Sequence, residues 1–221
     1  MTATLLFDLD GTLVETDWAH LAAFVEVFSG FGLPMDEHIF KTRIMGQPNL
    51  KIGEEFFPEL TLARRVEIFE EKEAVYRRII GKVEPVAGTL DLLAWARDNG
   101  ASCGVVTNAP RENADLILAG AGLDRWFGTV VCGQELEHGK PHPMAYLKGL
   151  SDLGGDVHRS VAFEDSIPGM TSALRAGLPC LGMTTNLPAA VLAEAGATMT
   201  APNMADPALL AFVKARVAAA V

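Results

Sequence analysis

Short runs of consecutive apolar residues alternate along this chain with segments whose apolar residues recur at helical spacing. Three of the runs, TLLFD, CGVVTN and SVAFED, each end in polar residues. Because they lack the regular polar alternation of a half-exposed strand, they predict parallel strands that are buried on both faces. Further strands are expected in TVVC near residue 130, PCLGM near residue 181 and ATMT near residue 198.

Helical segments follow these runs. Apolar residues at intervals of three and four, with charged residues between them, predict the helices of an α/β fold built on a parallel sheet. Six such helices are expected after residue 84: Gly88 to Asn99, Glu112 to Ala119, Met144 to Leu153, Gly169 to Ala176, Pro188 to Ala195 and Pro207 to Ala219.

The stretch from residue 15 to residue 83 contains no convincing strand. The segments WAHLAAFVEVF, EHIFKTRIM and LARRVEIFEEKEAVYRRII have apolar residues at helical spacing and charged opposite faces. We interpret residues 15–83 as an α-helical cap domain inserted into an α/β core of residues 1–14 and 84–221. The aromatic and aliphatic stripes of this segment are expected to form its own core.

Composition narrows the class of protein. The 221 residues are 49% hydrophobic, which supports a sizeable core, and the formal net charge of −10 disfavours nucleic acid as a partner. No apolar stretch is long enough to cross a bilayer, and the first residues lack the pattern of a signal peptide. We therefore expect a cytoplasmic protein without a membrane partner, either a monomer or a weak homo-oligomer.

The cysteines suggest neither a disulfide framework nor a zinc site. The chain has three of them, Cys103, Cys132 and Cys180, far apart and within or beside apolar runs. An odd number of widely spaced cysteines fits neither pattern. We expect all three to be small buried side chains.

Carboxylates gather where the apolar runs end. Asp8 and Asp10 are separated by one leucine, and like charges this close raise each other's pKa unless a cation or distinct roles separate them. The pair Asp10-Gly11 is equally typical of a simple turn. In open parallel sheets, ligands bind beyond the carboxyl ends of the strands. The polar residues expected to converge there are Asp8, Asp10, Thr107, Asn108, Glu164 and Asp165, with Lys140 from a loop.

This set of residues has the chemistry of a magnesium and phosphate site. Carboxylate oxygens are the hard ligands that Mg²⁺ prefers, together with water and substrate phosphate. Lys140 adds a positive charge, and the hydroxyl of Thr107 offers a hydrogen-bond donor. The structural alternatives are that Asn108 and Asp165 only begin helices and that Lys140 is an ordinary solvated lysine.

The motifs FDLDGTL, VVTNAP, GKPHP and FEDSIPG together resemble those of the haloacid dehalogenase superfamily, in the β-phosphoglucomutase-like branch with a helical cap. TNAPRENA, KPHPMAYLKGL and FEDSIPG also resemble broad-range sugar-phosphate phosphatases. The resemblance implies a Rossmann-like core with Mg²⁺ as cofactor and a small phosphorylated metabolite, such as a sugar phosphate, as substrate. The motifs run from residue 7 to about residue 169 and form a specific ordered set.

The resemblance also implies roles for individual residues. Asp8 would be the nucleophile that forms an aspartyl-phosphate, and Asp10 the general acid and base. Metal ligands would be Asp8, the carbonyl of Asp10, Asp165 and, directly or through water, Glu164. The residues expected to contact phosphate or substrate are Thr107, Asn108 and Lys140, together with His20 in the cap.

Among four candidate functions, this pattern favours phosphate ester hydrolysis. A phosphosugar mutase would carry an arginine in the cap for a second phosphate, whereas this chain has Asn49 at that place and Lys51 nearby. A phosphorylated-aspartate switch without turnover normally lacks a large insertion after its first strand. A dehalogenase does not need the acid that Asp10 provides. We therefore predict a Mg²⁺-dependent phosphatase of small phosphomonoesters, with mutase activity as the alternative.

Overall fold

The chain forms two compact units. The computed structural model describes residues 2–45 and 47–219. One unit joins Met1–Glu15 to Val83–Val221, and the other is Thr16–Lys82. The first unit is therefore discontinuous in sequence. The chain leaves it after Glu15, forms the second unit, and returns to it at Val83.

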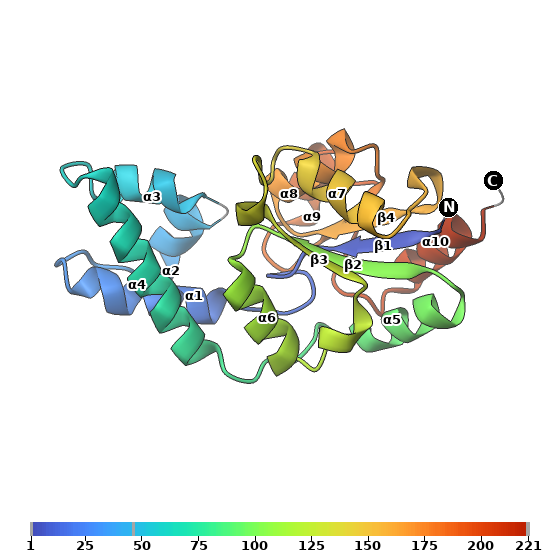
Figure 1. The fold of residues 1–221 in the computed structure, drawn as a ribbon, viewed down its shortest axis with the longest axis horizontal. Helices are drawn as coiled ribbons and strands as arrows, with labels where there is room; N and C mark the ends of the chain where they lie inside the picture. Colours follow the sequence, from blue (N-terminus) through green and yellow to red (C-terminus); the bar gives the residue numbers. More distant parts are fainter. Residues whose placement is uncertain (1, 46, 220–221) are drawn as a thin grey trace. The chain divides into compact units, whose positions relative to one another are not determined.

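Within the described residues, the larger unit contains a six-stranded parallel sheet with the order β3-β2-β1-β4-β5-β6 (Figure 1). The α/β fold expected from the sequence is confirmed. β1 lies in the middle, where Phe7 pairs with Val105 of β2 and Phe163 of β4. The strands are β1 (Thr4–Phe7), β2 (Ser102–Thr107), β3 (Thr129–Cys132), β4 (Val161–Glu164), β5 (Cys180–Met183) and β6 (Met199–Ala201).

Helices cover both faces of this sheet (Figure 1). Leu6 of β1 and Ala162 of β4 share a core with residues of α7, α8 and α9 on one face, while α5, α6 and α10 lie on the other. The helices are α5 (Thr89–Asp98), α6 (Arg111–Gly120), α7 (Met144–Asp152), α8 (Ile167–Arg175), α9 (Ala189–Glu194) and α10 (Pro207–Ala218).

Four helix starts, those of α5, α6, α8 and α9, differ from the expected ones by one or two residues, and two of them have an identifiable reason. α5 begins after Gly88 because this residue adopts a φ of 82°, which is outside the helical region. α8 begins two residues before Gly169 because the Oγ of Ser166 accepts a hydrogen bond from Gly169 N at 3.2 Å, and Pro168 lies in the first turn. Serine caps and first-turn prolines both favour a helix start.

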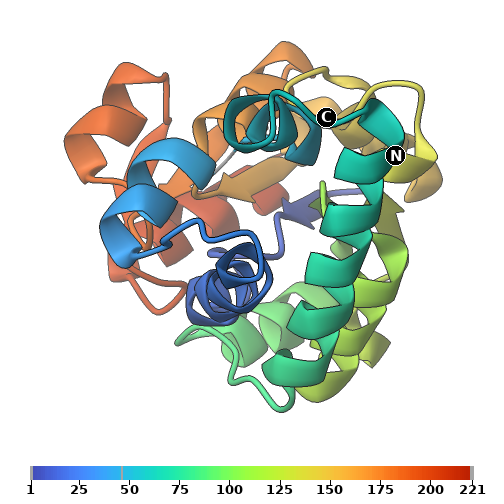
Figure 2. The ribbon, with the colours of Figure 1, turned by 90° about the vertical axis from the view of Figure 1, so that its left-hand side faces the viewer.

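The unit Thr16–Lys82 is helical in its described residues. Its long helix α4 is drawn in teal in Figure 2. Phe24, Phe28, Phe40 and Ile68 belong to a hydrophobic core of this unit, as the apolar stripes predicted. The elements are α1 (Asp17–Ser29), α2 (Glu37–Ile39), a π-helical turn (Phe40–Ile44), α3 (Asn49–Phe56) and α4 (Leu62–Ile80).

Two features of this unit were not anticipated. The segment EHIFKTRIM forms a single α-helical turn that widens into a π-helical turn, instead of a continuous helix. Helix α3 was not among the expected helices, because its eight residues are too few for a clear period. The extended Pro48 precedes α3, and Ile52 and Gly53 form its buried side.

The three cysteines are core residues. Cys103, Cys132 and Cys180 are buried and free of disulfide bonds, as expected. Among the described residues, no helix combines the length and apolar character that crossing a membrane requires.

Candidate active site

The strand order reverses around β1, which places Asp8 at a favoured position for a binding site. β1 lies between β2 on one side and β4 on the other, and α/β sheets bind ligands beyond the carboxyl ends of strands at such a switch point. Asp8 follows β1 directly, and its N–H donates to the carbonyl of Phe163 at 3.0 Å. The backbone of Asp8 is thus held by the neighbouring strand.

A tight turn follows Asp8. Gly11 adopts a φ of 79°, and its N–H donates to the carbonyl of Val14 at 2.7 Å. A Cβ at Gly11 would lie 2.3 Å from Oδ2 of Asp165, so only glycine fits here. The turn expected at Asp10-Gly11 is therefore present, and it leaves the half-buried Asp10 two residues beyond Asp8.

Lys140 links two of the expected carboxylates. Its Nζ lies 2.6 Å from Oδ1 of Asp8 and 2.5 Å from Oε1 of Glu164. The side chain of Lys140 is only 3% exposed, and that of Glu164 is fully buried. The interpretation of Lys140 as a solvated surface lysine is therefore wrong, because this ammonium group is enclosed between carboxylates at the ends of β1 and β4.

Glu164 has partners on both carboxylate oxygens. Besides Lys140, Oε1 accepts a hydrogen bond from the Tyr146 hydroxyl at 2.8 Å, and Oε2 accepts one from Ser166 Oγ at 3.0 Å. A Cβ at Gly169 would lie only 1.9 Å from this carboxylate, so the glycine is required by close packing. Tyr146 was missed because an aromatic residue in an amphipathic helix is typical of a core position.

Asp165 has a partner in the loop that follows β5. Its Oδ2 accepts a hydrogen bond from Asn186 Nδ2 at 2.7 Å, and Asn186 lies in the loop that follows β5. Asn186 was also missed, although it follows a predicted strand and could have been found by the rule applied to the other strands. Oxygens of Asp8, Glu164 and Asp165 all lie within 4.8 Å of one another.

When ionised, the carboxylates of Asp8, Glu164 and Asp165 carry more negative charge than Lys140 neutralises. Burial raises the pKa of Asp8 to about 7, against the opposing effect of Lys140. Burial and the charges of Asp8 and Glu164 hold the pKa of Asp165 well above its usual range. Burial alone would lower the pKa of Lys140, but its two carboxylate partners raise it above its ordinary value. The ammonium therefore stays charged while the carboxylates compete for it.

A divalent cation fits this donor set. Buried carboxylates with raised pKa values are relieved by a nearby positive charge, and their hard oxygens are suitable ligands. Asp8 and Asp165 are the best placed to hold a cation, because both oxygens of Glu164 already accept hydrogen bonds.

Thr107 and Asn108 lie at the end of β2. Thr107 is 2% exposed, and its Oγ1 accepts a hydrogen bond from Ala109 N at 3.0 Å, which leaves its own hydroxyl proton available to donate. The side chain of Asn108 instead bonds the backbone of Lys140. Neither residue serves only as a helix cap, since α6 begins after Pro110 without a side-chain cap.

His20 lies in α1 of the Thr16–Lys82 unit. Its ring stacks on Tyr76 with 4.1 Å between centroids, and its Nδ1 lies 3.1 Å from Lys72 Nζ. Lys72 also pairs with Glu73 at 2.8 Å, and Asn49 Nδ2 lies 3.5 Å from the same oxygen of Glu73. Lys72 and Glu73 were missed because charged residues on an amphipathic helix are typical of a solvated face.

Arg111, at the start of α6, is held by structural contacts. Its guanidinium donates to both oxygens of Glu135, at 2.8 and 2.7 Å, and to the carbonyl of Val130 at 2.7 Å. This geometry ties α6 to β3 and to the turn that follows it.

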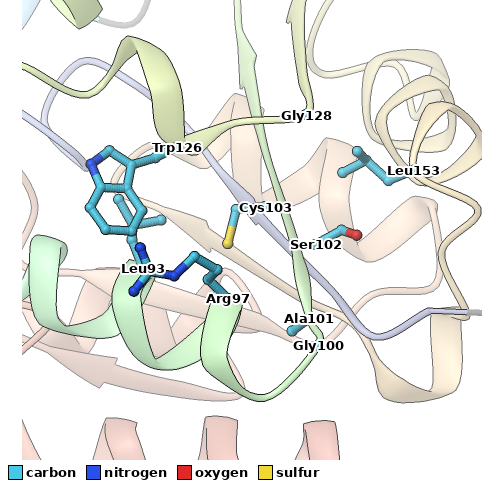
Figure 3. A pocket seen from close by; sticks show the side chains of 9 residues that line it. All are labelled: Leu93, Arg97, Gly100, Ala101, Ser102, Cys103, Trp126, Gly128 and Leu153. Carbon is cyan, nitrogen blue, oxygen red and sulfur yellow. The ribbon is translucent and has the colours of Figure 1, made fainter.

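A separate cavity of about 330 Å³ lies near the amino end of β2 (Figure 3). Arg97 lies over the ring of Trp126 at 5.2 Å, and Ser102 and Cys103 come from the beginning of the strand. Because Asp8 and Thr107 lie at the carboxyl ends of their strands, this cavity belongs to the opposite edge of the sheet. Its lining residues are Leu93, Arg97, Gly100, Ala101, Ser102, Cys103, Trp126, Gly128 and Leu153.

Comparisons with known proteins agree with the fold and the motifs. Residues 5–183 match the haloacid dehalogenase-like hydrolase family. The chain is similar to validoxylamine A 7'-phosphate phosphatase of Streptomyces hygroscopicus subsp. limoneus, with 28% identity over 88% of this chain and 92% of that protein. It is also similar to a phosphorylated carbohydrates phosphatase of Thermotoga maritima, with 30% identity over 79% and 81% of the two chains.

A solved structure supports the same assignment. The crystal structure of a family IA, variant 3 hydrolase from Entamoeba histolytica superposes with a TM-score of 0.87 and 25% identity, covering 98% of this chain and 99% of that one. Since residues 5–183 match the family and the motif residues at the ends of β1 and β4 gather around one lysine, the chain belongs to the haloacid dehalogenase-like hydrolase family.

Proposed function

We propose that this enzyme is a Mg²⁺-dependent phosphatase that hydrolyses small phosphomonoesters, sugar phosphates among them, through an aspartyl-phosphate on Asp8. The observation that carries the proposal is the buried ammonium of Lys140, held between Asp8 and Glu164 at the carboxyl ends of β1 and β4. The names of two relatives, a phosphorylated carbohydrates phosphatase and validoxylamine A 7'-phosphate phosphatase, support this substrate class.

Asp8 would act as the nucleophile. Lys140 holds its Oδ1, so the carboxylate is fixed in orientation while Oδ2 is the oxygen assigned to attack. In the first step a bond forms between this oxygen and phosphorus, and the bond from phosphorus to the leaving alcohol oxygen breaks. Asp10 would give that oxygen its proton, which produces the free alcohol.

The second step restores the enzyme. Asp10, now a carboxylate, would accept a proton from a water molecule as the water oxygen attacks phosphorus. The bond between phosphorus and the Asp8 oxygen then breaks, and inorganic phosphate leaves. Thr107 would donate its hydroxyl proton to a phosphate oxygen, and Lys140 would offset charge on the phosphoryl group as it transfers.

Asp8, Asp165 and the backbone carbonyl of Asp10 would hold Mg²⁺, with Glu164 contributing through water. When bound, the cation supplies positive charge that aligns the phosphoryl oxygens and lowers the repulsion between them and the nucleophile. Asn186 would keep Oδ2 of Asp165 occupied, so that its other oxygen remains for the cation.

The unit Thr16–Lys82 is proposed to be a cap that selects substrates, with His20 as a substrate contact. Asn49 and Glu73 lie together in this unit, and Lys72 is paired with Glu73. An amide beside a neutralised ion pair is better suited to sugar hydroxyls than to a second phosphate, which favours hydrolysis of monophosphates over mutase action.

The experiment that tests this proposal is phosphate release from a panel of small phosphomonoesters, with Mg²⁺ or with a chelator. We expect Mg²⁺-dependent release by the wild type and none by Asp8→Asn. Asp98→Asn, an exposed aspartate on α5, is the matched control and should behave as the wild type. If a folded wild type releases no phosphate from any compound but interconverts sugar phosphates, the enzyme is a mutase; a stable phosphoprotein without turnover would indicate a switch.

A further inference from the structure

The carboxamide of Asn108 is bound at both of its polar atoms by the backbone of one residue far along the chain. Its Oδ1 accepts a hydrogen bond from Lys140 N at 3.0 Å, and its Nδ2 donates one to Lys140 O at 3.2 Å. A carboxamide offers an acceptor and a donor in one plane, which is what such a pair requires. We call this pair of hydrogen bonds the Asn108 clamp.

Two glycines provide the space that the Asn108 clamp occupies. A Cβ at Gly133 would lie 2.4 Å from Asn108 Oδ1, and a Cβ at Gly139 would lie 2.8 Å from the same atom. Both separations are shorter than side-chain contacts allow. The loop between β3 and Lys140 is therefore built around the amide of Asn108, and not merely adjacent to it.

The Asn108 clamp is anchored on the sheet. Asn108 directly follows Thr107, the last residue of β2, and the hydrogen bond from Ala109 N to Thr107 Oγ1 fixes the turn at this point. Lys140 begins on a loop, but its Nζ has to reach Asp8 and Glu164 together. A flexible four-carbon stem can do this reproducibly only if its backbone is held in place.

We propose that Asn108 is a positioning residue that aims Lys140 at Asp8 and Glu164, and that its side chain is not a substrate contact. This inference rests on the proposed function, because it assigns Asn108 a task in that reaction. It also revises the sequence-based expectation, which placed Asn108 among the phosphate- and substrate-binding residues. The proposal predicts that Asn108 matters to catalysis only while Lys140 is present.

A double-mutant cycle measures this dependence. Asn108→Ala in the wild type should lower kcat about 10- to 100-fold, the usual effect of removing a supporting hydrogen-bond partner, with a smaller change in KM. In a Lys140→Ala background, the same substitution should change kcat little, since both changes act through one group. An equal loss in both backgrounds, or a loss expressed mainly in KM, would overturn the proposal in favour of substrate contact.

Hydrogen exchange gives a readout that needs no activity. The amide of Lys140 donates to Asn108, so its exchange should accelerate in Asn108→Ala and also in Gly139→Ala, which forces the carboxamide aside while retaining it. Asn99→Ala is the control, because Asn99 only bonds the carbonyl of Trp95 at an exposed helix end. Unchanged exchange at Lys140 in both variants would exclude the Asn108 clamp, whereas accelerated exchange in a protein without phosphatase activity would refute the proposed function alone.

Discussion

Lys140 and Lys72 are both buried lysines, but their neighbours differ. Lys140 lies between Asp8 and Glu164, which come from strands far apart in sequence, and Asp165 adds a further carboxylate nearby. Lys72 pairs with the adjacent Glu73 and lies over aromatic rings, 4.9 Å from the centroid of Phe24 and 5.5 Å from that of Tyr76.

The Lys72–Glu73 pair is balanced in charge, whereas the group of carboxylates around Lys140 is not. One lysine and one glutamate neutralise each other in the Thr16–Lys82 unit, whereas the group at the strand ends holds several carboxylates around one ammonium. Burial raises the pKa values of Asp8 and Asp165, and the neighbouring carboxylates raise them further. A buried group with excess negative charge is unfavourable by itself and is suited to binding a cation.

The largest expected effect comes from removing one lysine at a time. Lys140→Met leaves two buried carboxylates without their ammonium partner and should cost about 3–5 kcal/mol in free energy of unfolding, measured in urea with a chelator. Lys72→Met should cost less, because only one carboxylate, that of Glu73, loses an ammonium partner and the methionine packs on aromatic rings.

Mg²⁺ should distinguish the two lysine variants. Adding it should restore part of the stability of Lys140→Met, since a cation replaces the missing positive charge, and nothing of the stability of Lys72→Met. Equal recovery of both variants would show that the charge imbalance does not determine where the cation binds.

Gly169→Ala tests how tightly the Glu164 carboxylate is enclosed. The new methyl group would lie 1.9 Å from this carboxylate, and overpacking of this kind costs about 1–3 kcal/mol. We expect lower stability in urea and a large loss of phosphate release. Gly30→Ala is the matched change in the other unit, where φ is −61° and a Cβ would meet only the carbonyl of Val27 at 3.3 Å. Comparable losses from both substitutions would argue against the enclosure of Glu164.

The pH dependence of stability is a smaller effect with a definite sign. The pKa of Asp8 in the folded protein, about 7, exceeds its ordinary value of 3.8. Between these values the folded state keeps a proton that the unfolded chain has released, so stability falls as the pH rises through this window. In chelator we expect a loss of at least about 1 kcal/mol, or roughly 2–4 °C in Tm, from pH 4 to pH 7.

Thermal denaturation at several pH values measures this slope. Asp8→Asn should reduce it, because the titrating carboxyl is removed, and Lys72→Met should leave it unchanged. Added Mg²⁺ should raise Tm more at pH 8 than at pH 5, since protons compete with the cation for the same oxygens. An Asp8→Asn variant as steep as the wild type would assign the slope to other groups.

Arg111→Gln should have the smallest effect. Its ion pair with Glu135 is partly exposed, with side chains 36% and 48% accessible, so it should contribute no more than about 1 kcal/mol to stability. Because all three of its hydrogen bonds described above are structural, kcat/KM should remain near the wild-type value. A tenfold loss of kcat/KM without unfolding would make Arg111 a functional residue.

The sequence predicted the features that depend on local pattern. Buried strands that end in carboxylates indicated the sheet, and the strand-end rule identified Asp8, Glu164 and Asp165 as neighbours. Lys140 became identifiable through the motif around it, because one lysine in a loop has no periodic signal. These predictions succeed because strand burial and strand ends are properties of short segments.

The partners of these residues could not be predicted in the same way. Tyr146 has the spacing of a core residue, and only the fold shows that its hydroxyl reaches Glu164. The contact between Asn108 and Lys140 spans 32 positions and depends on two glycines whose need for space is visible only in three dimensions. Lys72 lies on a helix whose charged residues predict a solvated face, yet it is buried against aromatic rings.

Because the larger unit is discontinuous in sequence, its first strand is translated well before the strands that pair with it. β1 leaves the ribosome before both of its sheet neighbours, and Thr16–Lys82 is a contiguous segment that is complete before β2 is made. Asn186 is translated 178 residues after Asp8, an interval of about 10–40 s at ordinary elongation rates. The apolar first strand is therefore unpaired and accessible to chaperones during this interval, and Asp8, which follows it, is made long before its partners.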